Sequence, residues 1–297
     1  PYGYGDGGGG PARDYIEYAK RQEDLEGSVK VKMAGPMEFF QDMEKEGGPV
    51  NTYVGELYFS AHRGTYTSQA AVKKNNRRNE LAMREEEFWS SLGMGRGLDY
   101  DLAKADALWK ELLLHQFHDI LPGSSIGRVY VEANKAHEAI HSGAEELLNQ
   151  AIDALTERKE ENAVTVWNSL SFDRKALVEL PEAFAQGAKT VEGQAVPVQK
   201  TAEGVKAVVD IPSCGAVSLV PGEAAASGGS EAAVSVKEDG DGYVLENSQV
   251  RAVVDARGEV VSFVLKESGR EYAAQPMNRF RLYKDVPRLF DAWDIDS

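Results

Sequence analysis

The sequence predicts a multidomain protein of mixed α and β structure: the end of an α/β domain, then a three-helix bundle, then β-sandwich domains. Three observations support this. A Gly-rich loop and short helical patterns open the chain, three long segments with a helical apolar period follow, and short strand patterns fill the rest. We place the domains at residues 1–48, 49–160, 161–224 and 232–297.

The first of these regions is expected to form one βα-type turn of an α/β layer. An amphipathic helix is predicted at 14–22, a basic and apolar strand at "SVKVKMAG", and a second helix from Pro36. The chain opens at Pro1 and closes on "FDAWDIDS" without a terminating signal. We therefore expect both ends to be cuts within a longer chain.

Three consecutive helices are predicted in the second region, and they suggest a bundle. The first helix ends in "NRRNELAMREEEFWSSL", and the third covers "RVYVEANKAHEAIHSGAEELLNQAIDAL". The second covers "LDYDLAKADALWKELLLHQFHDIL", where either Asp99 or Asp101 is placed to cap its N-terminus.

After "TERKEENA" the apolar period changes from helical to alternating, which indicates strands. The Ala/Gly/Ser stretch "GEAAASGGSEAA" is the best linker candidate, and beyond it a second β domain turns at "ARG" and "ESG". The predicted strands before the linker are "VTVWNSLSF", "KALVELP", "AVPVQK", "VKAVVDIP" and "AVSLVPG".

The composition and net charge of the chain limit the kinds of molecule that it is expected to bind. The formal net charge of -15 at pH 7 argues against a surface for nucleic acid or for an anionic membrane, and a neutral small molecule or a sugar fits better. Cys214 is the one cysteine, which excludes an internal disulfide and fits a reducing, cytoplasmic compartment. No apolar run approaches the roughly 20 residues of a membrane helix.

The segment "HQFHDILPGSSI" ends the second predicted helix with groups that can bind metal or transfer protons. On a helical wheel His118 lies opposite Trp109, and His115 lies about 60° from His118, so the pair is expected to face away from the bundle core. The wheel's apolar stripe is Leu102, Trp109, Leu113 and Ile120, with Leu112 and Phe117 flanking it. Water and a neighbouring domain are both compatible with the histidine face.

Other candidate groups stay open in the same way. His137 and His141, at i and i+4 on the third helix, fit a solvated pair as well as two metal ligands. Asp6 in "GYGDGGGG" lies where a glycine backbone can approach a substrate, or in a merely flexible loop. In "AHRGTYT", three side chains suit polyol hydrogen bonding but also fit an ordinary loop: His62, Arg63 and Tyr66.

Six motifs follow one another along the chain: "GYGDGGGGP", "GELYFSAHRGTYTSQA", "NRRNE", "QFHDILPGSSI", "VWNSLSF" and "DAWDID". Taken together, they resemble the α-mannosidases of glycoside hydrolase family 38, bacterial type, across essentially the whole chain. This resemblance implies a zinc-dependent retaining exo-α-mannosidase that hydrolyses terminal α-mannosides, with an α/β catalytic domain before the bundle.

The resemblance also implies roles for individual residues. His118 matches the zinc-binding histidine that the bundle supplies, and Asp119 the aspartate that binds sugar hydroxyls. Asp6 is the candidate catalytic acid/base, although the family's eukaryotic members have Gly-Asp-Asp where this chain has Gly5, Asp6 and Gly7. The segment that contains His62, Arg63 and Tyr66 is expected to line the same substrate-binding cleft.

Two elements of the family site are missing from the sequence. It has no His-x-Asp pair, and the segment of the nucleophile is missing with it, so the remaining zinc ligands would lie outside these 297 residues. The chain alone is therefore expected to be inactive. The alternatives are a non-catalytic sugar-binding or assembly module and a hydrolase for a small mannoside such as mannosylglycerate, and a homo-oligomer stays open.

Overall fold

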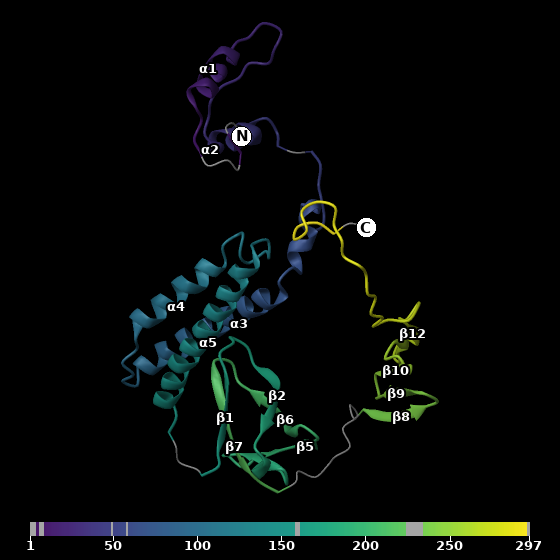
Figure 1. Ribbon diagram of the computed structural model, residues 1–297. Coiled ribbons are helices and arrows are strands. Elements are labelled where there is room, and N and C mark those ends of the chain that lie inside the picture. The colour runs from purple at the N-terminus through teal and green to yellow at the C-terminus, as the bar shows by residue number, and fades with distance from the viewer. Residues whose placement is uncertain are drawn as a thin grey trace. The chain divides into compact units, whose positions relative to one another are not determined.

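The computed structural model describes residues 4–5, 9–48, 50–57, 59–157, 161–223 and 234–295 (Figure 1). It divides into one unit from Pro1 to Tyr58 and a second from Phe59 to Ser297. Within the described residues, no helix is both long enough and apolar enough to cross a membrane.

The first unit contains the two predicted helices, α1 (Arg13–Gln22) and α2 (Pro36–Lys45). Pro36 occupies the first turn of α2, where its missing N–H leaves no helical bond unmade. The strand predicted at "SVKVKMAG" is not formed, and Val29 is 79% exposed. A strand needs a neighbouring strand to bond its backbone, and the described part of this unit contains none. The Val31 N–H donates instead to the Glu23 carbonyl just after α1, at 3.1 Å.

The second unit begins with the 3-10 helix η1 (Ser60–Tyr66) and three long helices, α3 (Ala70–Met94), α4 (Leu102–His115) and α5 (Gly127–Leu155). These are the three predicted helices. Met83, Leu112 and Ile140 join the three helices in one buried cluster, while Val72 and Tyr130 belong to another between α3 and α5.

The predicted apolar stripe is wrong at Leu102 and Leu113, which are 64% and 57% exposed. It is right at Trp109 and Ile120, which pack half-buried against the two clusters. The fully buried residues of α4 are Ala105, Leu112 and His115. The run of three leucines at 112–114 lets more than one face look apolar, so the partner helix decides. A side-chain carbon on Gly143 of α5 would lie 2.8 Å from the Leu108 side chain, so this glycine makes room for α4 on that face.

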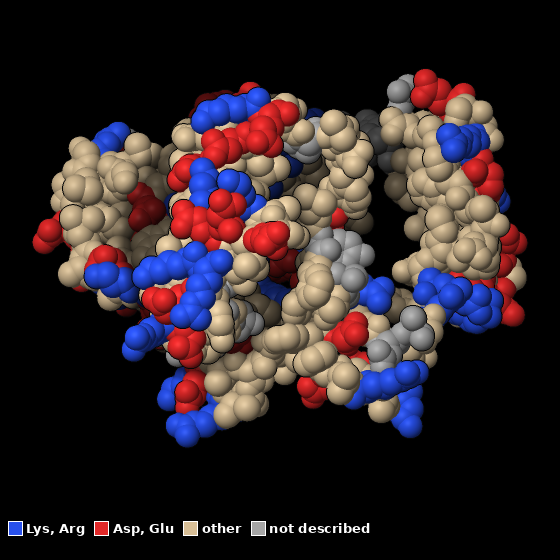
Figure 2. Space-filling model, turned by 90° about the horizontal axis from the view of Figure 1, so that it is seen from above, with Lys and Arg blue, Asp and Glu red and all other residues tan. Residues whose placement is uncertain are grey.

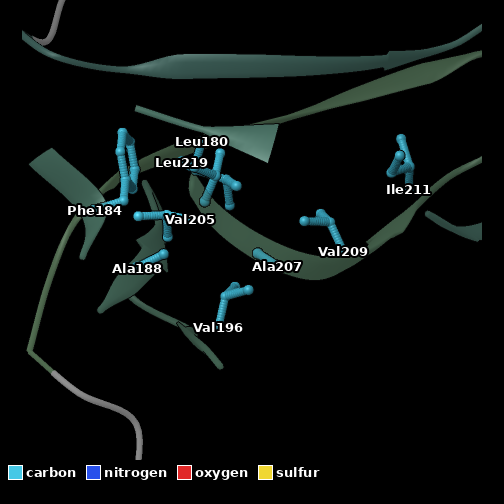
Figure 3. Close-up of a cluster of buried hydrophobic side chains, with 9 residues drawn as sticks. All are labelled: Leu180, Phe184, Ala188, Val196, Val205, Ala207, Val209, Ile211 and Leu219. Carbon is cyan, nitrogen blue, oxygen red and sulfur yellow. The ribbon is translucent and has the colours of Figure 1, made fainter. Parts of the chain in front are cut away.

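Two antiparallel sheets follow the bundle, in the orders β1-β7-β3-β4 and β2-β6-β5. Buried side chains from both sheets form one core (Figure 3), and on β6 they alternate strictly as Val205, Ala207, Val209 and Ile211. The strands are β1 (Val164–Asn168), β2 (Arg174–Leu180), β3 (Ala188–Thr190), β4 (Ala195–Val196), β5 (Val198–Thr201), β6 (Gly204–Ile211) and β7 (Gly215–Pro221).

A third antiparallel sheet has the order β12-β11-β10-β9-β8, so its strands follow one another as a meander. The proposed linker is residues 222–233, of which 224–233 lie outside the described residues. The strands are β8 (Ser235–Asp239), β9 (Gly242–Glu246), β10 (Val250–Val254), β11 (Val260–Leu265) and β12 (Arg270–Glu271). On the face drawn in Figure 2, acidic and basic side chains are intermingled.

Candidate functional site

His118 lies in the connection between α4 and α5, which we call the His118 loop (residues 116–126). Its side chain is 78% exposed, and its Nε2 atom is 3.5 Å from Oδ2 of Asp119. The Phe117 ring packs on the His118 ring with 4.3 Å between centroids. The predicted exposure of His118 is confirmed, and the histidine and aspartate can contact one ligand together.

The loop that carries this pair is held by its own polar contacts. The Ser125 hydroxyl donates to the Asp119 carbonyl at 2.5 Å, and the Ser125 N–H donates to the Tyr130 hydroxyl at 2.6 Å. Tyr130 is buried in the first turn of α5. The exposed pair is therefore presented from a loop that is tied to the bundle core.

The prediction that His115 also faces away from the bundle is wrong. His115 is 7% exposed, its Nδ1 atom is 2.9 Å from the Glu111 carbonyl oxygen, and its ring is 5.3 Å from that of His137. The helix ends at His115, so a wheel extended through His118 does not apply. This contact with the preceding turn gives one ring nitrogen of His115 a hydrogen-bond partner, which offsets part of the cost of burying the imidazole.

Of the two alternatives left open for His137 and His141 on α5, the solvated pair is wrong. His137 is 1% exposed, and the Asn79 amide donates to its carbonyl oxygen at 2.8 Å and lies 3.1 Å from its Nδ1 atom. Burial, with the nearby His115, lowers the pKa of His137 to about 4. The His141 side chain is 15% exposed, beside Glu145. These histidines belong to the bundle interior.

A complete zinc site does not fit the described residues. Zinc takes four ligands in structural sites and three protein ligands in catalytic ones. No group of three or more His, Cys, Asp and Glu side chains in the described ranges could hold a metal ion. His118 and Asp119 offer two donor side chains, so further ligands would have to come from elsewhere.

Three other predicted site residues lie on or beside η1. The His62 ring packs between Phe59 and Trp293, at 4.8 and 4.6 Å. The Arg63 guanidinium donates to the Ile295 carbonyl at 3.5 Å, and Tyr66 is 60% exposed. Asp6 lies outside the described residues.

The packing of η1 on the C-terminal segment was not predicted. The Gly64 N–H donates to the Trp293 carbonyl at 2.7 Å, and a side-chain carbon on Gly64 would lie 3.0 Å from that carbonyl group. The glycine in "AHRGTYT" and the tryptophan in "DAWDID" were visible in the sequence. Nothing in either motif showed that they meet.

The segment after η1 also meets the His118 loop. Gly123 has a φ of +91°, and a side-chain carbon there would lie 2.6 Å from the Ser68 carbonyl oxygen. Ser68 in turn donates its hydroxyl to the Ala292 carbonyl at 3.0 Å. The structure thus brings together the ends of three segments that carry predicted site residues or motifs.

Comparison with known families places these segments in named domains. Residues 60–155 match the alpha mannosidase middle domain, and residues 245–297 match the glycosyl hydrolases family 38 C-terminal domain. The first range contains η1, the whole bundle and the His118 loop. The predicted order of a helical domain followed by β domains is confirmed.

The chain is also similar to curated proteins that are named alpha-mannosidases. Alpha-mannosidase 2C1 of Homo sapiens is 34% identical over 300 residues, which cover 99% of this chain and 27% of that protein. Alpha-mannosidase G of Dictyostelium discoideum is 29% identical over 337 residues, with 99% and 30% covered. The chain thus spans less than a third of the length of either relative.

Solved structures share the fold. An alpha-mannosidase from Enterococcus faecalis V583 has a TM-score of 0.54 at 16% identity, covering 88% of this chain and 36% of that one. A glycosyl hydrolase family 38 protein from Enterococcus faecalis has a TM-score of 0.53 at 15% identity, with the same coverage. From the two domain matches and the extended similarity to the curated relatives, the chain belongs to glycoside hydrolase family 38.

Proposed function

We propose that the complete protein hydrolyses terminal α-mannosides by a zinc-dependent, retaining mechanism. The observation that carries the proposal is the exposed His118 and Asp119 pair, which a tied-down loop presents within the mannosidase middle domain. The similarity to named α-mannosidases along 99% of the chain supports the choice of substrate.

In this proposal the pair has two distinct roles. His118 supplies one metal ligand through a neutral imidazole, and the Asp119 carboxylate accepts hydrogen bonds from sugar hydroxyls. The other ligands come from outside the described residues. A bound zinc ion would supply electrostatic stabilisation and orientation of the ring hydroxyls.

The proposed chemistry is a double displacement by two carboxyl groups about 5–5.5 Å apart. Asp6 is the proposed acid/base: it protonates the leaving oxygen in the first step and takes a proton from water in the second. The nucleophile that forms the glycosyl intermediate would lie outside this chain. Two inversions at the anomeric carbon give retention of configuration.

We expect His118→Ala in the complete protein to lower mannosidase activity by orders of magnitude and to deplete bound zinc, since a metal ligand is lost. Metal content by mass spectrometry and turnover of an aryl α-mannoside measure the two effects. Arg128→Ala, at an exposed residue on the first turn of α5, is the matched control. If His118→Ala keeps the metal content and turnover of the wild type, His118 is not a metal ligand.

Asp6→Asn should lower activity by about 10²–10⁴-fold, the usual cost of losing a general acid. An activated aryl mannoside needs little protonation of its leaving group, so it should lose less in the first step than a mannose disaccharide does. Turnover of both substrates by the variant measures the difference. Equal losses would exclude Asp6 from the acid role.

The same substrate panel separates this proposal from its alternatives. Activity confined to mannosylglycerate would point to a small-mannoside hydrolase, and mannoside binding without turnover would point to a sugar-binding module. We also propose a cytoplasmic location, supported by the single and exposed Cys214, which fits a reducing compartment.

A further inference from the structure

Lys73 lies in the first turn of α3 and bonds to two separate segments of backbone. Its Nζ atom donates to the carbonyl oxygens of Leu121 and Pro122 in the His118 loop, at 2.9 and 3.1 Å. It also donates to the Ser68 carbonyl just before α3, at 2.5 Å. An ammonium group has three donors, and all three are used.

This arrangement is specific for a long cationic side chain. The carbonyls of the loop are 48 and 49 positions away in sequence, so neither is a local helical contact. Lys73 is half-buried, and this partial withdrawal of the ammonium from water lowers its pKa below the ordinary value. Hydrogen bonds from a charged donor are stronger than those between neutral groups.

Gly123 brings the same two segments into direct contact. Its left-handed backbone is one that glycine adopts without strain, and a side-chain carbon would meet the Ser68 carbonyl, one of the three that Lys73 binds. The loop is therefore pressed against the start of α3 at the place where Lys73 bonds it.

The loop bonded in this way is the one that presents His118 and Asp119. Leu121 and Pro122 follow Asp119 closely, and the Asp119 carbonyl is bonded further along the loop by Ser125. With Tyr130 bonding the Ser125 N–H, the backbone is fixed at both ends of the stretch from 121 to 125. Removing the contact at 121–122 would free the end nearer the histidine.

We propose that Lys73 is a positioning residue, which holds the His118 loop against α3 so that His118 and Asp119 keep one orientation toward the metal and the sugar. This inference rests on the proposed function. The bonds themselves are independent of it. When a contact that holds a metal ligand in place is removed, the metal affinity of the site or the activity of the enzyme typically falls 10–100-fold.

The test compares Lys73→Met, Lys73→Arg and the control Lys74→Met in the complete protein. Met keeps the unbranched stem and helix propensity but donates no hydrogen bond. Lys74 is the adjacent, exposed lysine of the same helix. Three quantities are measured: amide hydrogen exchange of residues 117–126, zinc affinity by chelator competition, and kcat and KM on an aryl α-mannoside.

We expect Lys73→Met to speed exchange in the loop and to weaken zinc binding by about 10–100-fold. It should lower kcat more than it changes KM, because a displaced ligand harms the transition state most. Exchange in the middle of α3 and α5 should stay unchanged. Lys73→Arg, whose guanidinium can donate to the same carbonyls, should recover part of each loss, and Lys74→Met should match the wild type.

Each other result overturns the inference. Faster loop exchange with unchanged zinc affinity and kcat would make the lysine a structural support only. Unchanged loop exchange would show that Lys73 does not hold the loop. If Lys73→Met fails to fold, Lys73→Arg still decides, since wild-type loop exchange with a loss of activity contradicts positioning. A wild-type protein without mannosidase activity would contradict the proposed function. The loop exchange and the zinc affinity would still show whether Lys73 positions the loop.

Discussion

Glu86 is a fully buried carboxyl group in the helical bundle, where the Tyr100 hydroxyl donates to it at 2.9 Å. Burial raises the pKa of Glu86 to about 7, because the ionised form is poorly solvated. Neither residue stood out in the sequence. An exposed and a buried glutamate look alike in "MREEEFWSSL", and only the packing of α3 selects Glu86.

Glu86 should make the protein less stable as the pH rises. Its pKa in the folded state lies above the ordinary value of 4.5, so the folded state holds a proton that the unfolded state has lost between about pH 4.5 and 7. The free energy of unfolding therefore falls through that window. Glu86→Gln keeps an acceptor for Tyr100 and has no charge to bury. Urea unfolding from pH 4.5 to 8 should show a smaller loss in this variant, by at most about 3 kcal/mol.

The comparison between variant and wild type matters because His137 acts in the opposite direction. Its pKa is lowered to about 4, so its contribution is complete above its ordinary value of 6.5 and is lost as the pH falls toward 4. Glu138→Gln, at an exposed residue of α5, is the control. If Glu86→Gln follows the wild-type pH profile, Glu86 ionises normally in the folded protein.

At the scale of one helix, α4 shows which local signals are sufficient. Its N-terminus was predicted to have one of two caps, and the structure selects Asp101, whose carboxylate accepts from the Lys104 N–H at 2.9 Å. Its buried face was predicted wrongly at Leu102 and Leu113, because which of several apolar faces is covered depends on the helices packed against α4. Signals that act within one turn can be read from sequence, and those that depend on a partner element cannot.

The cap gives a direct test. Asp101→Ala should lower the free energy of unfolding by about 1 kcal/mol, since an N–H at the start of α4 loses its acceptor. Asp99→Ala, two residues earlier and exposed, should leave it within about 0.5 kcal/mol of the wild type. Urea unfolding monitored by circular dichroism measures both. Equal effects of the two substitutions would show that the cap does not stabilise the helix.

At the scale of the whole molecule, the β strands before the linker were predicted apart from β3, because alternation on strands such as β2 and β6 is a local pattern. The segment "SVKVKMAG" has a similar pattern and forms no strand, because a pattern cannot supply the neighbouring strand. The packing of η1 on Trp293 joins residues far apart in sequence, so no window of sequence contains it.

A narrow joint connects the bundle to the first two sheets, whose buried cores are separate clusters. The Arg84 guanidinium on α3 donates to the Ser169 hydroxyl at 2.7 Å and to its carbonyl at 3.0 Å, just after β1. The Trp89 and Trp167 rings meet edge to face with 5.0 Å between centroids. Two cores that share so few contacts unfold together only if the joint is strong enough.

We therefore expect Arg84→Met to uncouple the two cores. Charged hydrogen bonds contribute about 1.5–3 kcal/mol each, and Met keeps the apolar stem and the helix propensity while removing both. In rising urea, amides of β1 and β7 should exchange at a lower denaturant concentration than those of α5, whereas in the wild type the two sets should open together. Arg77→Met removes an exposed ion pair to Glu80 within the same helix and should preserve the joint opening. If β1 and α5 already open separately in the wild type, or still open together in Arg84→Met, this joint does not couple the domains.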